Sequence, residues 1–573
     1  MIKIQVNNRE IDANPGEMLL EALNRAGIKV PTLCYMKDLF PTGACRMCVV
    51  EVEGAPGLVP SCAFPVREGL KIQTHSERAV RARKTIVELL LSNHPDDCLY
   101  CSRNGECHLQ NLSEELGIRQ RRYTGLKSNH KPDTSSPSIV REPAKCILCG
   151  KCVRTCEEIQ GVSAIDFVGR GSRTVVSPAF NRGLNVSSCV DCGQCILACP
   201  TGALTEKSKF KEIFAAINDP KKFVVVQHAP AVSVTLGELF GINPGVDVAG
   251  VMNAALRRLG FDRVFDTSFS ADLTIMEEAS ELFHRIKTGG KLPMFTSCCP
   301  AWIDFMEQNY PDMLDNLSTC KSPQQMLGAV VKTFYAERQG LKPEDIYVVS
   351  VMPCTAKKYE AQLPTHSKDG YPDVDAVITT RELARIIKMR GLHLESMEPE
   401  GADTTFGERS SAGKLFGATG GVMEAAIRTA HYLGTGGELE DLKVKAVRGL
   451  DGVKEAKVKI GDLEVGVAVA HTLGNARKLV EEIRNGRSDL HFIEIMSCPG
   501  GCVGGGGQPI GTDIEAVKVR MKALYMIDKD DELRVSHKNQ QVQRLYDEYL
   551  GQPLGEKSHH ILHTEYSKRE VDF

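Results

Sequence analysis

CILCGKCVRTC at residues 146–156 and CVDCGQCILACP at residues 189–200 decide the fold of the middle of this chain. Both stretches carry the spacing CxxCxxCxxxC, so a short unit of closely spaced thiols is duplicated. The N-terminal residues lack the basic segment and apolar core of a secretory signal, so we expect a cytoplasmic protein with reduced cysteines. Under those conditions several CxxC spacings favour metal ligands over disulfides. The two stretches therefore predict iron–sulfur clusters.

The duplicated unit resembles the two-cluster bacterial ferredoxins, in which the fourth cysteine of each run binds the other cluster. Pro200 follows the second run as that pattern requires, whereas Glu157 follows the first. The resemblance implies two [4Fe–4S] clusters, one held by Cys146, Cys149, Cys152 and Cys199 and the other by Cys156, Cys189, Cys192 and Cys195.

All but two of the 21 cysteines belong to sets of four metal-ligand positions, one of which is completed by a histidine. The first set is Cys34, Cys45, Cys48 and Cys62. A tight loop and a later strand would bring these thiols around a flat [2Fe–2S] cluster, although plant-type ferredoxins have a shorter first gap. The set is similar to that in the ferredoxin-like domain of respiratory complex I and of iron hydrogenases. A zinc ribbon is the alternative, and it would need two CxxC pairs where only one is present.

The second set is His94, Cys98, Cys101 and Cys107. Three thiolates and one imidazole could equally hold tetrahedral zinc, so the local spacing leaves both metals open. The position of the set, between one iron–sulfur unit and two more, favours a redox relay. The resemblance to complex I and to iron hydrogenases implies a [4Fe–4S] cluster, and a neutral imidazole in place of a thiolate should raise its reduction potential.

The last set comes from three distant blocks: FTSCCPAW at 295–302, VMPCTAKKYE at 351–360 and IMSCPGGCVGGGGQP at 495–509. Together these blocks resemble the catalytic domain of [FeFe]-hydrogenases, and the resemblance extends over essentially the whole chain. It implies a [4Fe–4S] cube held by Cys299, Cys354, Cys498 and Cys502. Cys502 would also bridge to a two-iron unit with CO, cyanide and a dithiolate bridge, which together with the cube forms the H-cluster. The glycines of the last block could instead cradle a phosphate, but the chain lacks GxxxxGK[ST].

Further side chains match the family's pocket around this cofactor: Lys357, Pro230, Gln324, Met352 and Met496. Lys357 could donate a charge-assisted hydrogen bond to cyanide, and the alternative is a solvated lysine beside Lys358. Without the resemblance, ordinary core packing would explain both methionines. Ala231 stands where some relatives have serine, so a hydroxyl contact to cyanide is not expected there. Ser497 stands where alanine is common and could shift the potential of the cube.

The leftover thiol Cys298 adjoins a ligand and could carry a proton. In TIMEEASELFHRI the side chains of Glu278, Glu281 and Arg285 share one helix face by their spacing. The resemblance implies a proton path from surface to metal through Arg285, Glu281, Ser318, Glu278 and Cys298. Helix geometry alone favours a surface ion pair between Glu281 and Arg285. The other leftover, Cys320, is expected to be a small buried hydrophobic residue.

Length and composition predict a multidomain α/β protein. With 573 residues, 42% apolar and 25% charged, the chain is too long for one core, and its net charge of −3 gives no reason to expect nucleic acid. No apolar run is long enough to suggest a membrane span. A linker or exposed loop is predicted at 128–138, where Ser, Pro and Asp are frequent. We expect a β-grasp ferredoxin-like [2Fe–2S] domain at 1–78, a small [4Fe–4S] domain with one histidine and three cysteine ligands at 79–127, a bacterial two-[4Fe–4S] ferredoxin-like domain at 128–208 and an α/β hydrogenase catalytic domain at 209–573.

The resemblance implies an enzyme, an [FeFe]-hydrogenase that interconverts H₂ with two protons and two electrons and that depends on dedicated maturation proteins. Its electrons would pass through one [2Fe–2S] and three accessory [4Fe–4S] clusters. The partner stays open between ferredoxin alone and a complex whose other subunits carry FMN, NAD(H) and a [2Fe–2S] cluster. A hypothesis of another class is a non-catalytic iron–sulfur sensor or assembly protein, against which the presence of Cys298, Glu278 and Lys357 argues.

Overall fold

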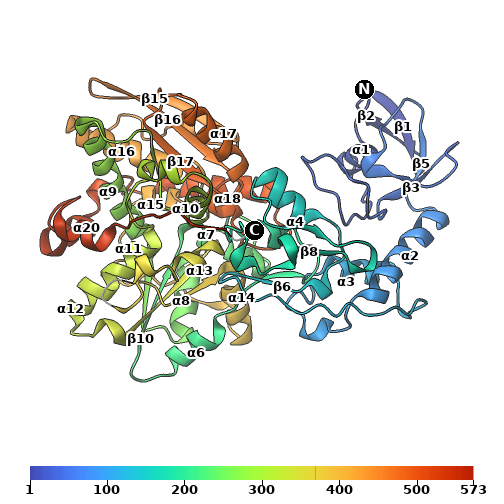
Figure 1. Cartoon of the computed structure of the whole chain (residues 1–573), viewed down its shortest axis with the longest axis horizontal. Helices are drawn as coiled ribbons and strands as arrows, with labels where there is room; N and C mark the ends of the chain where they lie inside the picture. Colours follow the sequence, from blue (N-terminus) through green and yellow to red (C-terminus); the bar gives the residue numbers. More distant parts are fainter. Residues whose placement is uncertain (368–369, 572–573) are drawn as a thin grey trace.

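The computed structural model describes residues 1–367 and 370–571. The chain is a mixed α/β protein in which the N-terminal part, blue to teal in Figure 1, lies to one side of a larger C-terminal body. Within the described ranges, no helix is both long and apolar enough to cross a membrane. In Figure 1 the first two ligand-bearing regions lie together on one side, and the duplicated cysteine unit lies between them and the C-terminal body.

The first region is a five-stranded sheet of order β2-β1-β5-β3-β4 that packs on helix α1 (Leu19–Arg25). Its strands are β1 (Ile2–Val6), β2 (Arg9–Ala13), β3 (Val49–Val52), β4 (Val59–Pro60) and β5 (Lys71–Gln73). Alternate residues of β1 point inward, so Ile4 and Val6 join Leu19 and Leu23 in one core. β1 pairs antiparallel with β2 and parallel with β5.

Helix α2 (Glu77–Asn93) leads from this sheet to the second ligand set, and α3 (His108–Glu115) follows that set. The Ser76 hydroxyl caps α2 by accepting from the N–H three residues later. The buried Arg83 donates hydrogen bonds of 2.7 Å to the carbonyl oxygens of Val49 and Thr74. These bonds tie the helix to the sheet and thereby place His94, which directly follows the last turn.

The duplicated cysteine unit is built on two small antiparallel sheets. One pairs β6 (Ile139–Arg141) with β9 (Leu204–Glu206), and the other pairs β7 (Asp166–Val168) with β8 (Val175–Ser177). Short helices α4 (Lys151–Arg154) and α5 (Gln194–Ala198) begin inside the two cysteine runs, each after a glycine with positive φ. The same spacing thus produces the same local turn twice.

The segment 128–138 forms no helix or strand, as predicted, but its second half is not an exposed linker. Ser136 and Ser138 are buried. The Ser136 hydroxyl donates to an Asp191 oxygen at 2.6 Å, and an Asp133 oxygen accepts from the Leu184 N–H at 3.1 Å. Polar side chains are frequent here because they satisfy the duplicated unit's polar groups, including buried ones, so the exposed-loop interpretation is wrong for this half.

The C-terminal body contains two four-stranded sheets. The first, of order β11-β10-β13-β14, is parallel throughout and consists of β10 (Phe223–His228), β11 (Arg263–Asp266), β13 (Ile346–Met352) and β14 (Ala376–Thr379). The second, of order β12-β17-β16-β15, consists of β12 (Met294–Phe295), β15 (Val453–Ile460), β16 (Leu463–His471) and β17 (Phe492–Met496), with only β15 and β16 antiparallel. Inner strands are buried on both faces and are therefore mostly apolar, although β10 ends in buried Gln227 and His228 and β17 contains buried Glu494.

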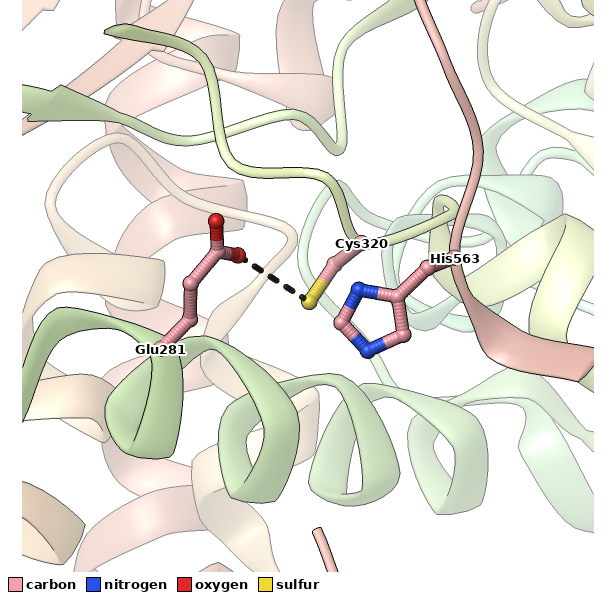
Figure 2. A group of neighbouring side chains, drawn as sticks. All are labelled: Glu281, Cys320 and His563. Carbon is pink, nitrogen blue, oxygen red and sulfur yellow. Dashed lines mark hydrogen bonds between the residues drawn. The ribbon is translucent and has the colours of Figure 1, made fainter. Parts of the chain in front are cut away.

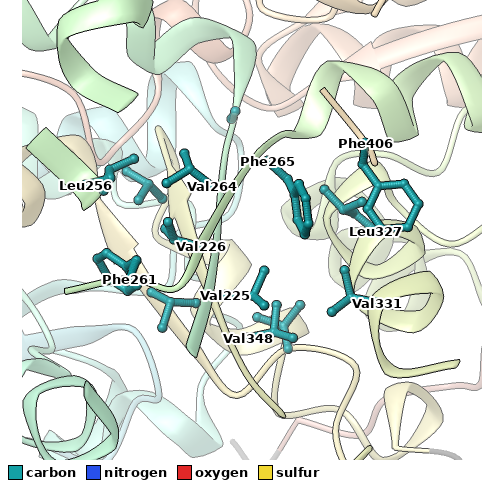
Figure 3. Close-up of a cluster of buried hydrophobic side chains, with 14 of the residues drawn as sticks. Val225, Val226, Leu256, Phe261, Val264, Phe265, Leu327, Val331, Val348 and Phe406 are labelled. Carbon is teal, nitrogen blue, oxygen red and sulfur yellow. The ribbon is translucent and has the colours of Figure 1, made fainter. Parts of the chain in front are cut away.

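The core of the first sheet has two faces, both visible in Figure 3. Val226 points towards Leu256 of helix α8 (Ala249–Leu259), whereas its neighbour Val225 points towards the side of Leu327 in α11 (Pro323–Val330). Successive residues of a strand face opposite sides, so helices are needed on both. Phe406 closes one edge, with its ring centroid 5.1 Å from that of Phe265.

The remaining helices surround both sheets. They are α6 (Phe210–Ile217), α7 (Pro230–Ser233), α9 (Thr267–Thr288), α10 (Pro300–Asn309), α12 (Ala336–Gln339), α13 (Ala356–Glu360), α14 (Thr380–Met389), α15 (Ser411–Leu415), α16 (Gly421–Thr435), α17 (Leu473–Arg484), α18 (Ile514–Asp530), α19 (Gln540–Leu545) and α20 (Glu556–Leu562). Helix α9 packs on α11, α15 and α16 and buries several acidic side chains. Buried carboxyl groups need hydrogen-bonding or charged partners, or they serve a function, so α9 is a candidate to contribute functional residues.

Candidate active site and iron–sulfur sites

Four cysteines from distant segments meet beside the carboxyl ends of parallel strands. Cys299 precedes α10 just after β12, Cys354 follows β13, and Cys498 follows β17. Cys502 lies on a short 3₁₀ turn. Burial raises the pKa of Cys498 to about 12, and the Cys299 and Cys502 thiols add to the rise. Burial likewise raises the pKa of Cys354, with Cys498 and Cys299 adding. These mutual effects place the four sulfurs together in one buried site.

Glycines let the Cys502 loop approach its neighbours. A Cβ on Gly505 would lie 2.2 Å from the Pro353 carbonyl oxygen, and one on Gly506 would lie 2.3 Å from that of Cys192. Gly501 has a φ of +93°, a value that side-chain-bearing residues rarely adopt. The glycine-rich block therefore packs backbone against backbone around the quartet.

The quartet adjoins the second cysteine run. Gln194 donates from Nε2 to the Gly504 carbonyl oxygen at 2.9 Å, and the Thr355 hydroxyl donates to that of Asp191 at 2.6 Å. Burial raises the pKa of Cys192, and Cys498 is among the thiols that raise it further. The catalytic body and the duplicated unit thus meet at their cysteine loops.

Each half of the duplicated unit surrounds a cavity lined by sulfur. The first cavity is lined by Cys156, Cys189, Cys192 and Cys195. The second is lined by Cys146, Cys149, Cys152 and Cys199. Each cavity therefore takes its fourth cysteine from the other run.

The first ligand set forms two thiol pairs in the N-terminal region. A hydrogen bond from Cys45 is the main cause that lowers the pKa of Cys34 to about 5, and one from Cys62 lowers the pKa of Cys48 to about 6. The Cys34 thiolate also acts on Cys48 and Cys62, so the two pairs are neighbours. A donor set of four adjacent thiols fits an iron–sulfur cluster.

The second set carries an imidazole nitrogen poised for a metal. His94 Nε2 is buried and has no hydrogen-bond partner in the part of the chain that the structure describes, while Nδ1 lies 3.0 Å from the Pro95 carbonyl oxygen. After burial, the Cys101 thiolate raises the pKa of both Cys98 and Cys107. A buried histidine nitrogen of this kind, close in sequence to three thiols, is suited to bind a metal, either zinc or the iron of a cluster.

Arg103 is a buried cation between two ligand sets and was not among the residues predicted from the sequence. It is 1% exposed and donates from Nη2 to the Glu106 and Cys199 carbonyl oxygens. Its Nε and Nη1 have no partner among residues 1–367 and 370–571. A Cβ added to Gly202 would lie 2.7 Å from Cys101 Sγ. The second ligand set and the cavity lined by Cys199 are therefore adjacent. The only sequence signal was a basic residue between two ligands.

Lys357 is buried and directed at the quartet rather than at solvent. The residue is 9% exposed, and Nζ lies 3.0 Å from both the Cys298 carbonyl oxygen and a Glu360 carboxylate oxygen. Gln324 donates to the same carboxylate at 3.0 Å. The alternative of a solvated lysine is therefore wrong, as it is for Lys358, which is also buried. Glu360, one turn after Lys357 on α13, had no signal in the sequence.

The other predicted pocket residues lie in the surrounding core. Met352 and Met496 are buried at the ends of β13 and β17, each two residues before a cysteine of the quartet. Pro230 is buried at the first position of α7. The Ser497 hydroxyl accepts from the Cys299 thiol at 3.3 Å. An apolar wall with one hydroxyl near the sulfurs is the result.

Helix α9 presents Glu278, Glu281 and Arg285 on one face, as predicted. Arg285 donates to Glu281 Oε1 at 2.6 Å, and the Ser318 hydroxyl donates to Oε2 at 2.8 Å. The side chains of Glu281 and Arg285 are only 9% and 11% exposed, so the surface ion pair expected from helix geometry is wrong. The pair is covered because Arg285 also donates to the Leu317 carbonyl oxygen of the neighbouring loop.

Glu278 is a fully buried acid one turn before Glu281 on α9. Its Oε1 accepts only long hydrogen bonds from Ser297, and Oε2 has no partner within the described ranges. Burial raises the pKa of Glu278 to about 8, and the Glu281 charge adds to the rise. The Ser297 N–H that donates to Glu278 belongs to the residue directly before Cys298, and after burial the Glu278 charge raises the pKa of Cys298. A carboxyl that titrates near neutral pH suits proton transfer.

A C-terminal strap, residues 562–569, covers this row of residues and was not predicted. Tyr566 donates its hydroxyl to the Ser318 carbonyl oxygen at 2.8 Å. Cys320 is fully buried, as expected, yet its thiol points at Glu281 Oε2 from 3.9 Å, with His563 of the strap on its other side (Figure 2). The strap therefore covers Ser318 and Cys320, next to Glu281 in the predicted row.

Known families match each of the four regions that carry the ligand sets. Residues 222–506 match the C-terminal domain of the iron-only hydrogenase large subunit, and residues 514–569 match the iron hydrogenase small subunit. Residues 1–77 match a 2Fe-2S iron–sulfur cluster binding domain and residues 145–203 a 4Fe-4S dicluster domain. Residues 83–122 match the iron–sulfur binding region of NADH-ubiquinone oxidoreductase-G.

Two relatives that align over the whole length of the chain are also hydrogenases. The chain is 48% identical to the NADP-reducing hydrogenase subunit HndD of Solidesulfovibrio fructosivorans, over 100% of this chain and 99% of that one. It is 41% identical to iron hydrogenase 1 of Clostridium pasteurianum, over 99% and 100%. An apo [FeFe]-hydrogenase structure from Chlamydomonas reinhardtii aligns with a TM-score of 0.58 at 44% identity, covering 63% of this chain and 99% of that one. The non-catalytic alternative is not favoured, and the chain belongs to the iron-only, or [FeFe], hydrogenases, oxidoreductases that here carry accessory iron–sulfur domains.

Proposed function

We propose that this chain interconverts H₂ with two protons and two electrons at an H-cluster held by Cys299, Cys354, Cys498 and Cys502. The observation that carries the proposal is the convergence of these four sulfurs beside Cys298, a thiol that no ligand set needs and that neighbours Glu278. When bound, the H-cluster would supply the metal chemistry of H₂ and exchange electrons with the accessory clusters. The chain supplies the cage, the dry walls and the proton route.

The walls and the buried cation suit an anionic, bulky cofactor. The buried side chains of Met352, Met496 and Pro230 would exclude water from the site. The Lys357 ammonium lies at its edge, held by Glu360, and offers a charge-assisted hydrogen bond to a cyanide group. Gln324 supports the same carboxylate and keeps its Oε1 unsatisfied within the described chain.

Protons would move along the row Arg285, Glu281, Ser318, Glu278 and Cys298. Glu281 holds hydrogen bonds from Arg285 on one oxygen and from Ser318 on the other, so it can receive a proton on one side and release it on the other. Glu278, with a pKa near 8 and one free oxygen within the described residues, would hold the proton next to Cys298. Cys298 would then deliver it at the thiol sulfur.

Electrons would pass along the remaining ligand sets in chain order. We assign the [2Fe–2S] cluster to residues 1–78, the His94 [4Fe–4S] cluster to 79–127, two [4Fe–4S] clusters to 128–208 and the H-cluster to 209–573. The contacts of Cys101 with Gly202 and of Gly506 with Cys192 support this order, because they join successive sets directly. Maturation proteins would have to supply the two-iron unit.

The partner follows from the relatives rather than from any site seen here. One relative is a subunit of an NADP-reducing hydrogenase, which supports a complex whose other subunits carry FMN, a nicotinamide site and a [2Fe–2S] cluster. Ferredoxin alone is the second candidate, supported by the whole-length match to iron hydrogenase 1. Co-purification of a flavin subunit with this chain would decide between them.

Infrared spectroscopy tests the proposal directly. Protein matured together with its maturation proteins should show CO and cyanide stretching bands and should evolve H₂ from reduced viologen. The variant Cys502→Ser is the matched control and should lose the bands while the accessory clusters remain. A matured protein with those bands absent and no H₂ evolution would contradict the proposal.

A further inference from the structure

A buried group of ligating side chains lies at the edge of the proton row. One oxygen of Glu281, the Cys320 sulfur and a ring nitrogen of His563 all lie within 4.8 Å of one another, and all three residues are buried. Figure 2 shows the sulfur between the carboxylate and the imidazole ring. Thiolate, imidazole and carboxylate are the ligand types of Zn²⁺, and catalytic and inhibitory zinc ions commonly take three protein ligands and one water.

The backbone sets this arrangement. Cys320 and His563 face each other in an isolated antiparallel bridge between the loop after α10 and the C-terminal strap. Two backbone hydrogen bonds of 2.8 Å flank the pair, one on either side. In such a non-hydrogen-bonded pair the Cα atoms are about 4.5 Å apart and the side chains are close. The backbone pairing thus brings the two residues close, and in the structure the sulfur and a ring nitrogen lie within 4.8 Å of each other.

Helix α9 supplies both the third ligand and the orientation of the ring. Glu277 lies one turn before Glu281, and its Oε2 is 3.1 Å from His563 Nε2. Burial acts to raise the pKa of Glu277, but hydrogen bonds led by that from His563 hold it below its usual value. An ionised carboxylate only accepts, so it keeps the imidazole hydrogen on Nε2 and leaves the lone pair on Nδ1. A carboxylate behind a histidine is the usual second partner of metal-binding histidines.

An ion could reach the group and its charge would be balanced. A cavity of about 320 Å³ beneath the strap is lined by Cys320 and Thr564 and extends to the exposed Lys568. The Cys320 thiolate and the Glu281 carboxylate together neutralise a divalent cation. Nδ1 of His563 now lies 2.8 Å from the Thr319 hydroxyl, which would rotate away to make room.

We propose that Glu281, Cys320 and His563 form a site for Zn²⁺, or a divalent ion of the same chemistry, whose occupation inhibits turnover. Binding forms bonds from the metal to the sulfur, the ring nitrogen and the carboxylate oxygen, and the thiol proton leaves to solvent. The inhibition rests on the proposed proton row, because the metal takes an oxygen of Glu281 that would otherwise carry a proton. The site itself rests only on geometry.

The experiment uses the matured holoenzyme under anaerobic conditions with Zn²⁺ as the probe. Zinc content is measured by elemental analysis after gel filtration, and the zinc X-ray absorption edge reports its ligands without interference from iron. H₂ evolution from reduced viologen is measured on the same samples. We expect one zinc per chain with one sulfur ligand, and a loss of turnover of about 100-fold, the usual share of a proton-transfer group.

Three variants make the test specific. Cys320→Ala should keep the parent's turnover without zinc, bind no zinc here and resist inhibition, and His563→Gln should do the same if the alanine variant fails to fold. His559→Gln is the matched control: its exposed ring stacks on His563 at a centroid distance of 4.5 Å, and its loss should change neither binding nor inhibition.

Two results would overturn the inference in different ways. Equal zinc binding and inhibition in the parent and in Cys320→Ala would show that the site is elsewhere. Zinc bound with one sulfur ligand but full turnover would remove the inhibitory role and would count against Glu281 as a proton carrier. An enzyme that evolves no H₂ even without zinc would refute the proposed function, while the zinc edge would still report on the site.

Discussion

Replacing Glu278 by glutamine separates the proton route from the stability of the fold. The carboxyl is fully buried, and burial, with a contribution from Glu281, raises its pKa from 4.5 to about 8. At 1.36 kcal/mol per unit, this shift corresponds to about 5 kcal/mol against the ionised form. Glutamine has the shape of the neutral carboxyl and never carries a charge, so the variant should fold at least as well as the parent.

The sign of the pH dependence follows from the raised pKa. Between about pH 4.5 and pH 8 the folded state binds more protons at Glu278 than the unfolded state does. The stability contributed by this residue is therefore full below pH 4.5 and falls as pH rises through that window. In Glu278→Gln this slope is absent, so the thermal midpoint should fall less between about pH 6 and pH 8 than it does in the parent.

Turnover, unlike stability, should fall in Glu278→Gln. An amide cannot accept and release a proton, so H₂ evolution from reduced viologen should fall about 100-fold or more, while iron content and infrared bands stay unchanged. Parent turnover should decline as pH rises through about 8, where Glu278 loses its proton. Glu278→Asp is the control, since it keeps a carboxyl and should retain intermediate turnover. A glutamine variant with more than about a tenth of parental turnover would refute the proton route.

Three further predictions follow from the site. Cys298→Ser should nearly abolish turnover and leave iron content unchanged, because the neighbouring Cys299 supplies the ligand; normal turnover would refute the route. Arg103→Met removes a buried cation beside two ligand sets and should make the reduction potentials of their clusters more negative in an electron paramagnetic resonance titration, with Arg103→Lys restoring them. Unchanged potentials would assign Arg103 a purely structural role. Gly506→Ala places a Cβ 2.3 Å from the Cys192 carbonyl oxygen and should lower iron incorporation. In the control Gly511→Ala the new Cβ has no atom within 4 Å, so this variant should differ from the parent only by a small backbone strain. Equal iron content in the two variants would contradict the packing argument.

Elements with strong local signals were predicted well. The segment around Glu278 lies within one helix, Thr267–Thr288, as the spacing of Glu278, Glu281 and Arg285 predicted. Segment 128–138 was predicted less well, because its polar residues satisfy buried groups of a neighbouring unit. Sequence composition does not distinguish a serine that faces water from one that caps distant backbone.

The candidate site likewise combines features that the sequence predicted with features that depend on distant neighbours. Lys357 and Arg285 are charged side chains that would be solvated on an isolated helix, and only the packing of loops over them makes their ion pairs buried. Glu360 and Arg103 carry no sequence pattern that differs from those of surface residues. Their importance comes from neighbours far away in the chain, which no window of sequence contains.

Cysteine spacing by itself predicted iron–sulfur chemistry for the duplicated unit, because closely spaced thiols in one loop bind a metal wherever the loop is attached. For the His94 set the spacing left zinc and a cluster open. The family followed from three short blocks around Cys299, Cys354 and Cys498. The resemblance implied that these blocks close on one another and that each ferredoxin-like cavity exchanges its fourth cysteine, and the tertiary structure brings the same cysteines together. Only the tertiary structure revealed that the strap brings His563 to Cys320. Those contacts join residues remote in sequence, and the free energy that forms them comes from burial of the whole molecule rather than from any local pattern.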